Sequence, residues 1–307
     1  MGKICYNIIG DDMHTREEKM KDIREVIETE EERKARKRFA IRIFKIIVFA
    51  FSFVVLFFLY TYFYSTKGLV IKEEKIVNEK IPVSFRGIKI IQFSDLHYGS
   101  TYYNNELKNV INKINKRRPD IVIFTGDLIN KDYNLKDSDK EAIIASLSNI
   151  DATLGKYAIF GEEDNDYTNS ILLQSGFKVL NNSKDDVYTT TNEYISLIGL
   201  SIDYNITQAF TNFDSSKYNI CIFHEPDIIT EILKDKTCDL ALAGHSHNGQ
   251  INVPFPIIRK HKGTKYYKEY YKIKDTDLYV SSGLGTSNIN VRVGSHPSIN
   301  FFRLYNN

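Results

Sequence analysis

Two histidines separated by a single residue, His245 and His247, follow the apolar run 240–243 and precede Gly249. An apolar run that ends at a glycine-containing turn is typical of a buried strand that opens into a tight loop. Neutral imidazole is a common ligand of divalent metals, so the pair could hold an ion at the end of this strand. Taken alone, the spacing is equally compatible with two loop histidines that have no chemical role.

Polar donors follow four other apolar segments of the chain in the same manner. These segments end in Ser-Asp-Leu-His, Gly-Asp, Gly-Glu-Glu-Asp and His-Glu-Pro-Asp, at residues 94–97, 126–127, 161–164 and 224–227. A single aspartate after a strand is more often a turn or capping residue than a metal ligand. Five apolar segments that all end in such donors are harder to explain as caps. The carboxyl ends of strands in open α/β sheets border the usual binding crevice, so donors there could meet at one site.

The candidate metal ligands offer nitrogen and oxygen atoms rather than sulfur. They are Asp95, His97, Asp127, Glu162, His224, His245 and His247. This number of donors suits two metal ions that share one carboxylate, and the donor type suits Mn, Fe or Zn better than Ca or Mg. Two such cations activate a water between them and bind phosphoryl oxygens, so the predicted nucleophile is a metal-bound hydroxide. The sequence contains no Gly-x-Ser-x-Gly or Walker-type motif that would favour serine hydrolysis or nucleotide-driven chemistry.

These strand ends can meet only if a sheet places them side by side. Apolar runs alternate with amphipathic helical patterns over the middle of the chain. We expect strands at 88–93, 121–124, 157–160, 194–200, 219–223 and 240–243, and helices at 104–118, 139–150 and 228–233. The segment from 266 onward contains strand-like runs punctuated by glycine and predicts further antiparallel strands. The alternation predicts an α/β or α+β domain whose sheets are sandwiched between helices.

An apolar segment near the N-terminus predicts a membrane anchor. Residues 46–64 contain no Asp, Glu, Lys, Arg or His, and at about 1.5 Å per residue a helix of this length crosses a bilayer core. We expect a charged segment at 1–42, a transmembrane helix at 43–64, a linker at 65–80 leading into an edge strand, and a folded domain at 81–307. Lys and Arg cluster just before the helix, which predicts a cytoplasmic N-terminus and an extracytoplasmic domain. The run is too long for a signal-peptide core and lacks a cleavage motif, which favours an uncleaved, single-pass anchor.

Composition restricts the possible partners. The chain has 307 residues, of which 42% are hydrophobic, and a formal net charge of +2, so it can bury a large core but offers no strong positive field for nucleic acid. Cys221 lies in an apolar run, which favours a small buried side chain over a metal ligand or nucleophile. A disulfide between Cys221 and Cys238 remains open if this part of the chain is outside the cytosol.

The motifs together resemble those of the calcineurin-like metallophosphoesterase superfamily. The resemblance is strongest to its single-pass, membrane-anchored bacterial branch, which includes proteins likened to UDP-2,3-diacylglucosamine hydrolases. It covers residues 81–304 and rests on FSDLHYG, FTGDLIN, GKYAIFGEED, FHEPD, LAGHSHNGQI and YVSSGLGTSNINVRVGSHP. It implies a four-layer sandwich of two mixed sheets flanked by helices. It also implies a phosphodiesterase or pyrophosphatase that acts on membrane or envelope phosphate esters, lipid-linked ones included.

The resemblance also implies a role for each candidate residue. One metal would be held by Asp95, His97 and His247, the other by His224 and His245, with Asp127 bridging both. The family has a ligating Asn where this chain has Glu162, and a His over the phosphate where this chain has Glu163.

Glu163 and Asp164 are the residues expected to act in catalysis beside the metals. Glu163 could protonate a leaving group only if its pKa were raised, whereas Asp164 matches the family and is expected to orient the loop. The two added carboxylates could equally repel phosphate. The alternative to an enzyme is therefore a degenerate member of the superfamily, a metal-binding or signalling module with weak or no hydrolysis.

Overall fold

A computed structural model of the chain describes residues 4–252, 263–287 and 289–307, with side chains described from residue 15 onward. The chain divides into two compact units, Met1–Leu59 and Tyr60–Asn307. The first unit is helical, and the second contains all the described strands.

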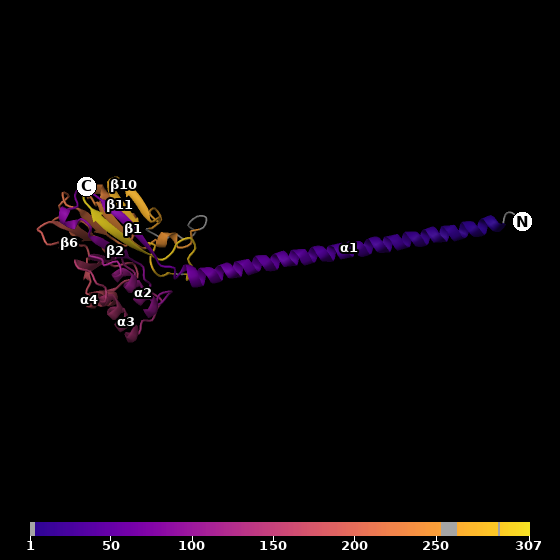
Figure 1. Cartoon of the computed structure of the whole chain (residues 1–307), viewed down its shortest axis with the longest axis horizontal. Coiled ribbons are helices and arrows are strands. Elements are labelled where there is room, and N and C mark those ends of the chain that lie inside the picture. Colours follow the sequence, from indigo (N-terminus) through magenta and orange to yellow (C-terminus); the bar gives the residue numbers. More distant parts are fainter. Residues whose placement is uncertain (1–3, 253–262, 288) are drawn as a thin grey trace. The chain divides into compact units, whose positions relative to one another are not determined.

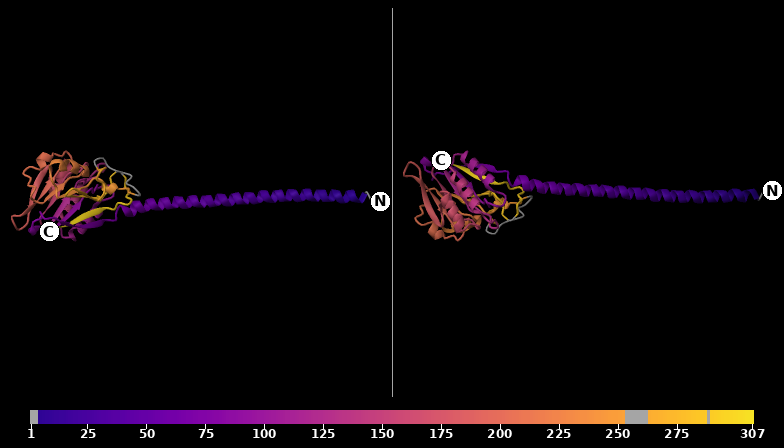
Figure 2. Two further views of the ribbon diagram at one scale, coloured as in Figure 1. Left: turned by 90° about the horizontal axis from the view of Figure 1, so that it is seen from above. Right: turned by 90° about the horizontal axis from the view of Figure 1, so that it is seen from below.

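The N-terminal unit is a single long helix, α1 (Ile4–Tyr60), which Figure 2 shows as uninterrupted. The charged segment and the apolar segment that the sequence distinguished therefore lie in one continuous helix. A π-helical turn, η1 (Thr61–Ser65), follows it. The helix over Thr15–Ser65 is the one helix among the described residues that could span a membrane by length and composition.

The first sheet of the second unit is six-stranded and mixed. Its strands lie in the order β1 (Val70–Val77), β12 (Ser298–Tyr305), β2 (Lys89–Phe93), β3 (Ile121–Phe124), β4 (Gly155–Ala158) and β5 (Lys178–Val179). Strands β2 to β5 are parallel, β12 runs antiparallel to β2, and β1 pairs parallel to β12. The carboxyl ends of β2, β3 and β4 therefore point the same way.

The second sheet is also six-stranded and mixed. Its strands lie in the order β10 (Tyr270–Ile273), β11 (Thr276–Val280), β9 (Leu240–Ala243), β8 (Asn219–Ile222), β7 (Tyr194–Gly199) and β6 (Ser183–Tyr188). Strands β7, β8, β9 and β11 are parallel, and the two outer strands are antiparallel to their neighbours.

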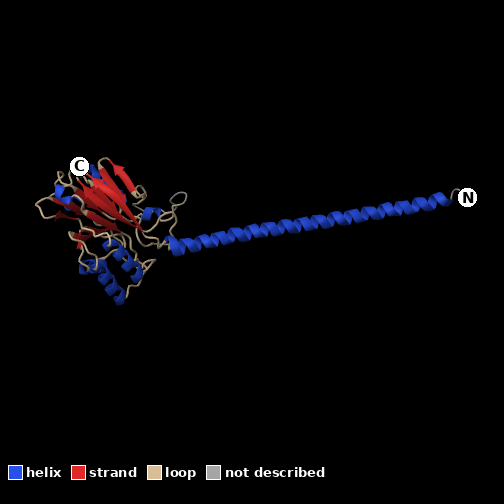
Figure 3. Cartoon of the chain, in the orientation of Figure 1, coloured by secondary structure: helices blue, strands red, loops and turns tan. Residues whose placement is uncertain are grey.

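Short helices complete the unit. The α-helices are α2 (Asn104–Asn115), α3 (Asp137–Ser148), α4 (Asp166–Gln174), α5 (Ile206–Ala209) and α6 (Ile229–Asp235). The 3-10 turns are η2 (Val83–Phe85), η3 (Pro226–Ile228) and η4 (His247–Gly249). Figure 1 shows α2, α3 and α4 gathered beside the strands, which Figure 3 draws in red.

Three buried clusters define the layers. The central cluster packs Ile121 and Ile123 of the first sheet against Ile220 and Ile222 of the second. On the outer face of the first sheet, alternate residues of the same strands, such as Val122, pack against α2, α3 and α4. On the outer face of the second sheet, a third cluster includes residues of α5 and α6. The predicted four-layer sandwich of two mixed sheets flanked by helices is confirmed, since strands buried on both faces need a helix layer outside each sheet.

The structure differs from the sequence-based expectations in two places. The interval 65–80, expected to be a linker leading into an edge strand, already contains that strand, β1, so the folded part begins before residue 81. Lysines and glutamates interrupt β1, as is usual at a sheet edge, so its bounds could not be located from an apolar run. The C-terminal strands are antiparallel in part, as expected: β10 is antiparallel to β11 and β12 to β2, whereas β11 pairs parallel to β9 and β12 parallel to β1. Parallel pairing is available to them because long connections separate the partners in sequence.

Candidate metal centre

The predicted site residues follow the carboxyl ends of five strands, three in the first sheet and two in the second. Asp95 and His97 follow β2, Asp127 follows β3, Glu162, Glu163 and Asp164 follow β4, His224 follows β8, and His245 and His247 follow β9. The backbone N–H of Asp95 donates to the carbonyl of Gly126, and that of Gly244 donates to the carbonyl of His224. Hydrogen bonds between neighbouring loops thus continue each sheet into the site.

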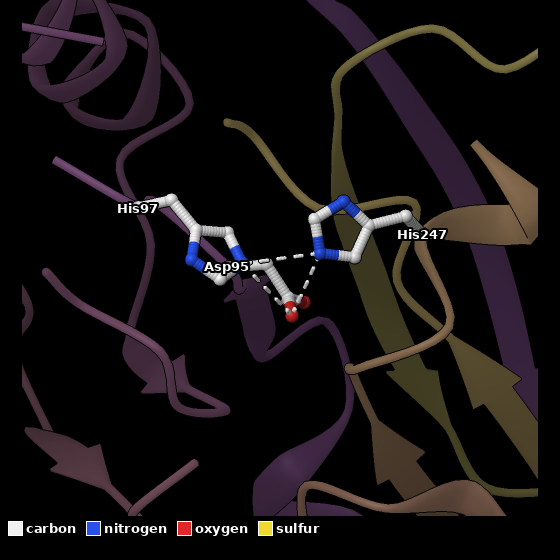
Figure 4. A group of neighbouring side chains, drawn as sticks. All are labelled: Asp95, His97 and His247. Carbon is white, nitrogen blue, oxygen red and sulfur yellow. Dashed lines mark hydrogen bonds and ion pairs between the residues drawn. The ribbon is translucent and has the colours of Figure 1, made fainter. Parts of the chain in front are cut away.

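Asp95, His97 and His247 form one compact group of donors, shown in Figure 4. The Nε2 atom of His247 lies 3.2 Å from Oδ1 of Asp95, and that of His97 lies 4.0 Å from the same oxygen. The two Nε2 atoms are 3.2 Å apart. Two nitrogen lone pairs at this distance repel each other unless a proton or a cation lies between them, so the donor geometry fits a cation.

Asp127, His224 and His245 form a second group, in which the ligand atoms lie within 4.8 Å of one another. Oδ2 of Asp127 is 3.2 Å from Nε2 of His224 and 3.7 Å from Nε2 of His97. The His224 ring is held from its other side, because Nδ1 lies 2.7 Å from the carbonyl oxygen of Thr125. The carboxylate of Asp127 therefore contacts a histidine of each group, as a shared ligand would.

Two glycines allow the loops to approach so closely. A Cβ atom on Gly161 would collide with the carboxylate of Asp127, and one on Gly244 would collide with the side chains of Ser94 and Asp95. Any other residue at these two positions would displace a candidate donor. The glycines in Gly-Glu-Glu-Asp and Gly-His-Ser-His are thus required by the packing of the site.

Most of the donors have a left-handed backbone. The φ angles are 50° for Asp95, 41° for His97, 61° for Asp127, 66° for His245 and 50° for His247. This region is uncommon for residues other than glycine and is found most often at functional sites.

Electrostatics in the site favour a positive ion. Burial alone would raise the pKa of Asp95 and lower that of His224. The attraction between carboxylates and imidazoles overrides burial: His247 and His224 lower the pKa of Asp95, and Asp127 and Asp95 help raise the pKa of His224 to about 10. An imidazole that retains its proton this strongly lies in a negative potential, which a divalent cation would neutralise instead.

The loop after β4 holds its three acidic residues in different environments. The Glu162 side chain is 65% exposed, and its nearest donor contact is Nδ1 of His245 at 3.9 Å. The Glu163 side chain is only 10% exposed and lies 3.0 Å from Nδ1 of His97. His97, Asp127 and Glu163 form a third group of possible ligands, whereas Glu162 lies at the rim and belongs to none of the three groups found among the described residues.

Asp164 organises this loop through the backbone. Its carboxylate accepts the N–H groups of Asp127 at 2.7 Å, Gly161 at 2.8 Å and Leu128 at 3.0 Å. Burial, followed by the repulsion of Asp127, raises the pKa of Asp164 to about 6 against the effect of these hydrogen bonds. Asp164 thus connects the loops after β3 and β4.

Arg292 was not identified as a site residue from the sequence. It is fully buried, and its Nη2 lies 3.3 Å from Nδ1 of His247 and donates to the carbonyl of Gly285 at 2.5 Å. Burial lowers the pKa of Arg292 to about 10. It lies in the segment INVRVGSHP, where a single arginine among apolar and small residues was the available signal.

Cys221 of β8 and Cys238, just before β9, are joined by a disulfide with a Cα–Cα distance of 5.8 Å. Of the alternatives open from the sequence, the structure therefore contains the disulfide. Both residues belong to the outer cluster of the second sheet, and their bond crosslinks the strands that precede His224 and His245.

Comparison with known proteins places this geometry in a family. The profile of the Calcineurin-like phosphoesterase family matches residues 88–249. The uncharacterized metallophosphoesterase YkuE of Bacillus subtilis is 32% identical over 76% of the chain and 84% of its own length. A transmembrane protein with metallophosphoesterase domain from Danio rerio is 27% identical, over 72% of the chain and 54% of its own length. The UDP-2,3-diacylglucosamine pyrophosphatase LpxG of Chlamydia muridarum is 25% identical, over 58% of the chain and 69% of its own length. The chain belongs to the calcineurin-like phosphoesterase family.

Proposed function

We propose that the protein is a phosphoester hydrolase of the phosphodiesterase or pyrophosphatase type that uses two divalent metal ions, Mn, Fe or Zn. The observation that carries the proposal is the position of Asp127, whose Oδ2 lies 3.2 Å from His224 and 3.7 Å from His97. One carboxylate is thereby shared between two groups of buried donors. This is the arrangement that a pair of ions requires, and nitrogen and oxygen ligands suit these metals.

Each residue has a proposed part in the site. Asp95, His97 and His247 would hold one ion, His224 and His245 would hold the other, and Asp127 would be shared between them. Glu162 would reach the second ion from the rim. When bound, the two ions supply a nucleophilic water and neutralise charge on the phosphoryl group. Asp164 keeps the loops after β3 and β4 together, so that the donors retain their spacing during turnover.

We further propose that α1 anchors the protein in a membrane with the hydrolase unit outside the cytoplasm. The apolar part of α1 has the length and composition of a spanning helix, and a basic cluster precedes it. The Cys221–Cys238 disulfide supports this location, because disulfides persist outside the reducing cytosol. A tethered site favours substrates at the membrane, and the pyrophosphatase activity in the name of LpxG fits a lipid-linked diphosphate.

The rival proposal is a degenerate module that binds metal but hydrolyses esters weakly or not at all. Glu162 and Glu163 favour it, because they add negative charge where an anionic phosphate must approach. The near-neutral net charge of the whole chain disfavours a nucleic-acid substrate in either case.

The two proposals differ in turnover. The full-length chain, purified in detergent, is assayed with Mn²⁺ on bis-p-nitrophenyl phosphate and on a lipid-linked diphosphate in micelles. Metal-dependent hydrolysis by the wild type that is lost in Asp127→Asn would support the hydrolase proposal. Two bound metal ions without hydrolysis of either substrate would support the degenerate module.

A further inference from the structure

Glu163 differs from its neighbour Glu162 in where its carboxylate lies. The Glu163 side chain is 10% exposed, compared with 65% for Glu162, and it points toward the first group of donors. Its Oε2 lies 3.0 Å from Nδ1 of His97 and 3.0 Å from the backbone N of Lys131. A single carboxylate oxygen therefore connects a candidate metal ligand to the loop after β3.

These contacts determine which nitrogen of His97 carries the proton. The N–H of Lys131 can only donate, so Oε2 of Glu163 acts as an acceptor there, and an ionised carboxylate in this role favours the His97 tautomer that presents Nδ1–H to it. The other ring nitrogen, Nε2, then carries the lone pair. That atom is the one that lies 3.7 Å from Asp127 and 3.2 Å from Nε2 of His247. Glu163 thus selects the tautomer of His97 that can bind a metal.

The backbone of residue 163 contacts the shared ligand as well. The N–H of Glu163 donates to Oδ1 of Asp127 at 2.8 Å, which leaves Oδ2 directed toward His224 and His97. The same residue consequently orients a histidine through its side chain and a carboxylate through its main chain. A carboxylate behind a ligating histidine fixes the ring and increases its basicity.

We propose that Glu163 is a positioning residue that holds His97 for the metal, in place of the leaving-group acid expected from the sequence. The proposal rests on the proposed function, since it assumes an ion at the Asp95, His97 and His247 group. The oxygen that accepts these two N–H groups, Oε2, is engaged by them and is not placed as a proton donor. Glu163 therefore acts through His97 and contributes to metal affinity, rather than to protonation of the leaving group.

Metal binding provides the primary test. Mn²⁺ is titrated into the metal-free full-length chain in detergent, and free Mn²⁺ is followed by electron paramagnetic resonance. We expect Glu163→Ala to weaken one of the two binding steps by about 10- to 100-fold, the usual effect of losing such a partner. Glu163→Gln, which keeps an acceptor oxygen without the charge, should weaken the same step by less. Glu141→Gln, an exposed glutamate on α3, is the matched control and should leave both steps unchanged.

The dependence on the leaving group separates positioning from acid catalysis. A lost proton donor would slow esters with poor leaving groups more than p-nitrophenyl esters, and Gln and Ala would be equally impaired. A lost positioning residue should slow both kinds of ester by the same factor, with Gln between Ala and the wild type. Wild-type affinity at both steps in Glu163→Ala and Glu163→Gln would overturn the proposal. If Glu163→Ala does not fold, Glu163→Gln alone decides, because the charged acceptor should still bind His97 more strongly than the amide does.

Failure of this proposal is distinguishable from failure of the proposed function. A wild-type chain that binds no Mn²⁺ would contradict the metal centre itself. A wild-type chain that binds two ions, together with variants that bind them equally well, would contradict only the role of Glu163.

Discussion

The two sheets make different contributions to the site. The first sheet carries every candidate carboxylate, from Asp95 after β2 to Asp164 after β4, together with His97. The second sheet carries only imidazoles, at His224, His245 and His247. Negative charge is thus concentrated at the end of one sheet and positive or neutral donors at the end of the other.

This division lowers the cost of burying the carboxylates. Carboxylates gathered on one sheet would repel each other, and burial would increase the repulsion. The imidazoles of the opposite sheet relieve it, which is why attraction across the sheets lowers the pKa of Asp95 and raises that of His224 to about 10. A metal ion would replace that attraction with a stronger one and fasten the two sheets together at this edge.

The largest expected effect comes from removing the carboxylate that both groups share. Asp127→Asn should lower hydrolysis of bis-p-nitrophenyl phosphate by at least about 100-fold, because it weakens two metal sites at once. Asparagine accepts a left-handed backbone, so the fold should persist. Asp132→Asn, an exposed aspartate in the loop after β3, is the control. Equal activity in the two variants would show that the first sheet does not supply the shared ligand.

The disulfide belongs to the second sheet alone. Replacing Cys221 and Cys238 together by Ala should lower the free energy of unfolding by about 3 kcal/mol, since the bond closes a loop with a sequence separation of 17. Chemical denaturation of the folded variant measures the loss, and Cys5→Ser controls for the third cysteine. Metal content should remain that of the wild type, because the bond lies in the outer cluster of that sheet. A large loss of metal would mean that the bond also positions the imidazoles.

Removal of metal should show how much each of the two donor groups contributes to stability. At a free Mn²⁺ concentration of about 100 times the dissociation constant, each site adds about 2.7 kcal/mol to stability, and EDTA removes that contribution. Thermal unfolding with and without EDTA measures the difference as a shift in Tm. The shift should be smaller in His224→Gln, which leaves one group intact. An identical shift in the variant would mean that His224 holds no ion.

The metal-free chain should become less stable as the pH rises. The pKa of His224 is about 10 in the folded state against an ordinary value of 6.5, so its contribution is complete below pH 6.5 and disappears as the pH approaches 10. Asp164, with a pKa of about 6 against 3.8, contributes in the same direction at lower pH. Urea unfolding in EDTA between pH 6.5 and 10 tests the first statement. His224→Gln should flatten the profile, and a wild-type profile that rises with pH would contradict it.

The smallest effect is expected at the rim of the site. Glu162→Asn removes one negative charge from a side chain that is 65% exposed, so screening by water and salt limits the consequence. Mn²⁺ affinity should change little, while the rate on a dianionic phosphomonoester should rise a few-fold relative to a diester. The ratio of the two rates, measured at two salt concentrations, tests this. A complete loss of one metal ion would instead make Glu162 an essential ligand.

The parts of the fold that could be predicted from the sequence are those with a strong local pattern. The bounds of β3 and β9 follow from fully apolar runs that end at glycine or at a polar turn. The polar edge strand β6 and the short helix α4 were not predicted, since charged and exposed residues obscure their periodicity. Asn165, which caps α4 by accepting two backbone N–H groups, was a signal that could have located that helix.

The same limit applies to the site. The donors at the strand ends could be found because their residue types and order are local features of the sequence. The contact of Glu163 with His97 joins positions 66 residues apart, and that of Arg292 with His247 joins positions 45 residues apart. Both depend on how two loops approach each other across the sheet edge, which no local pattern encodes.

The left-handed conformations of Asp95, His97, Asp127, His245 and His247 carry a consequence for protein engineering. Holding a non-glycine residue in this region costs of the order of 1 kcal/mol or more of conformational free energy. The left-handed backbone at each candidate ligand therefore lowers the stability of the fold. His245→Gly should therefore relieve this backbone strain and abolish the gain from added metal, whereas His247→Gly would also remove the imidazole that lowers the pKa of Asp95. Selection for thermal stability alone would therefore act against the backbone conformations that metal binding needs.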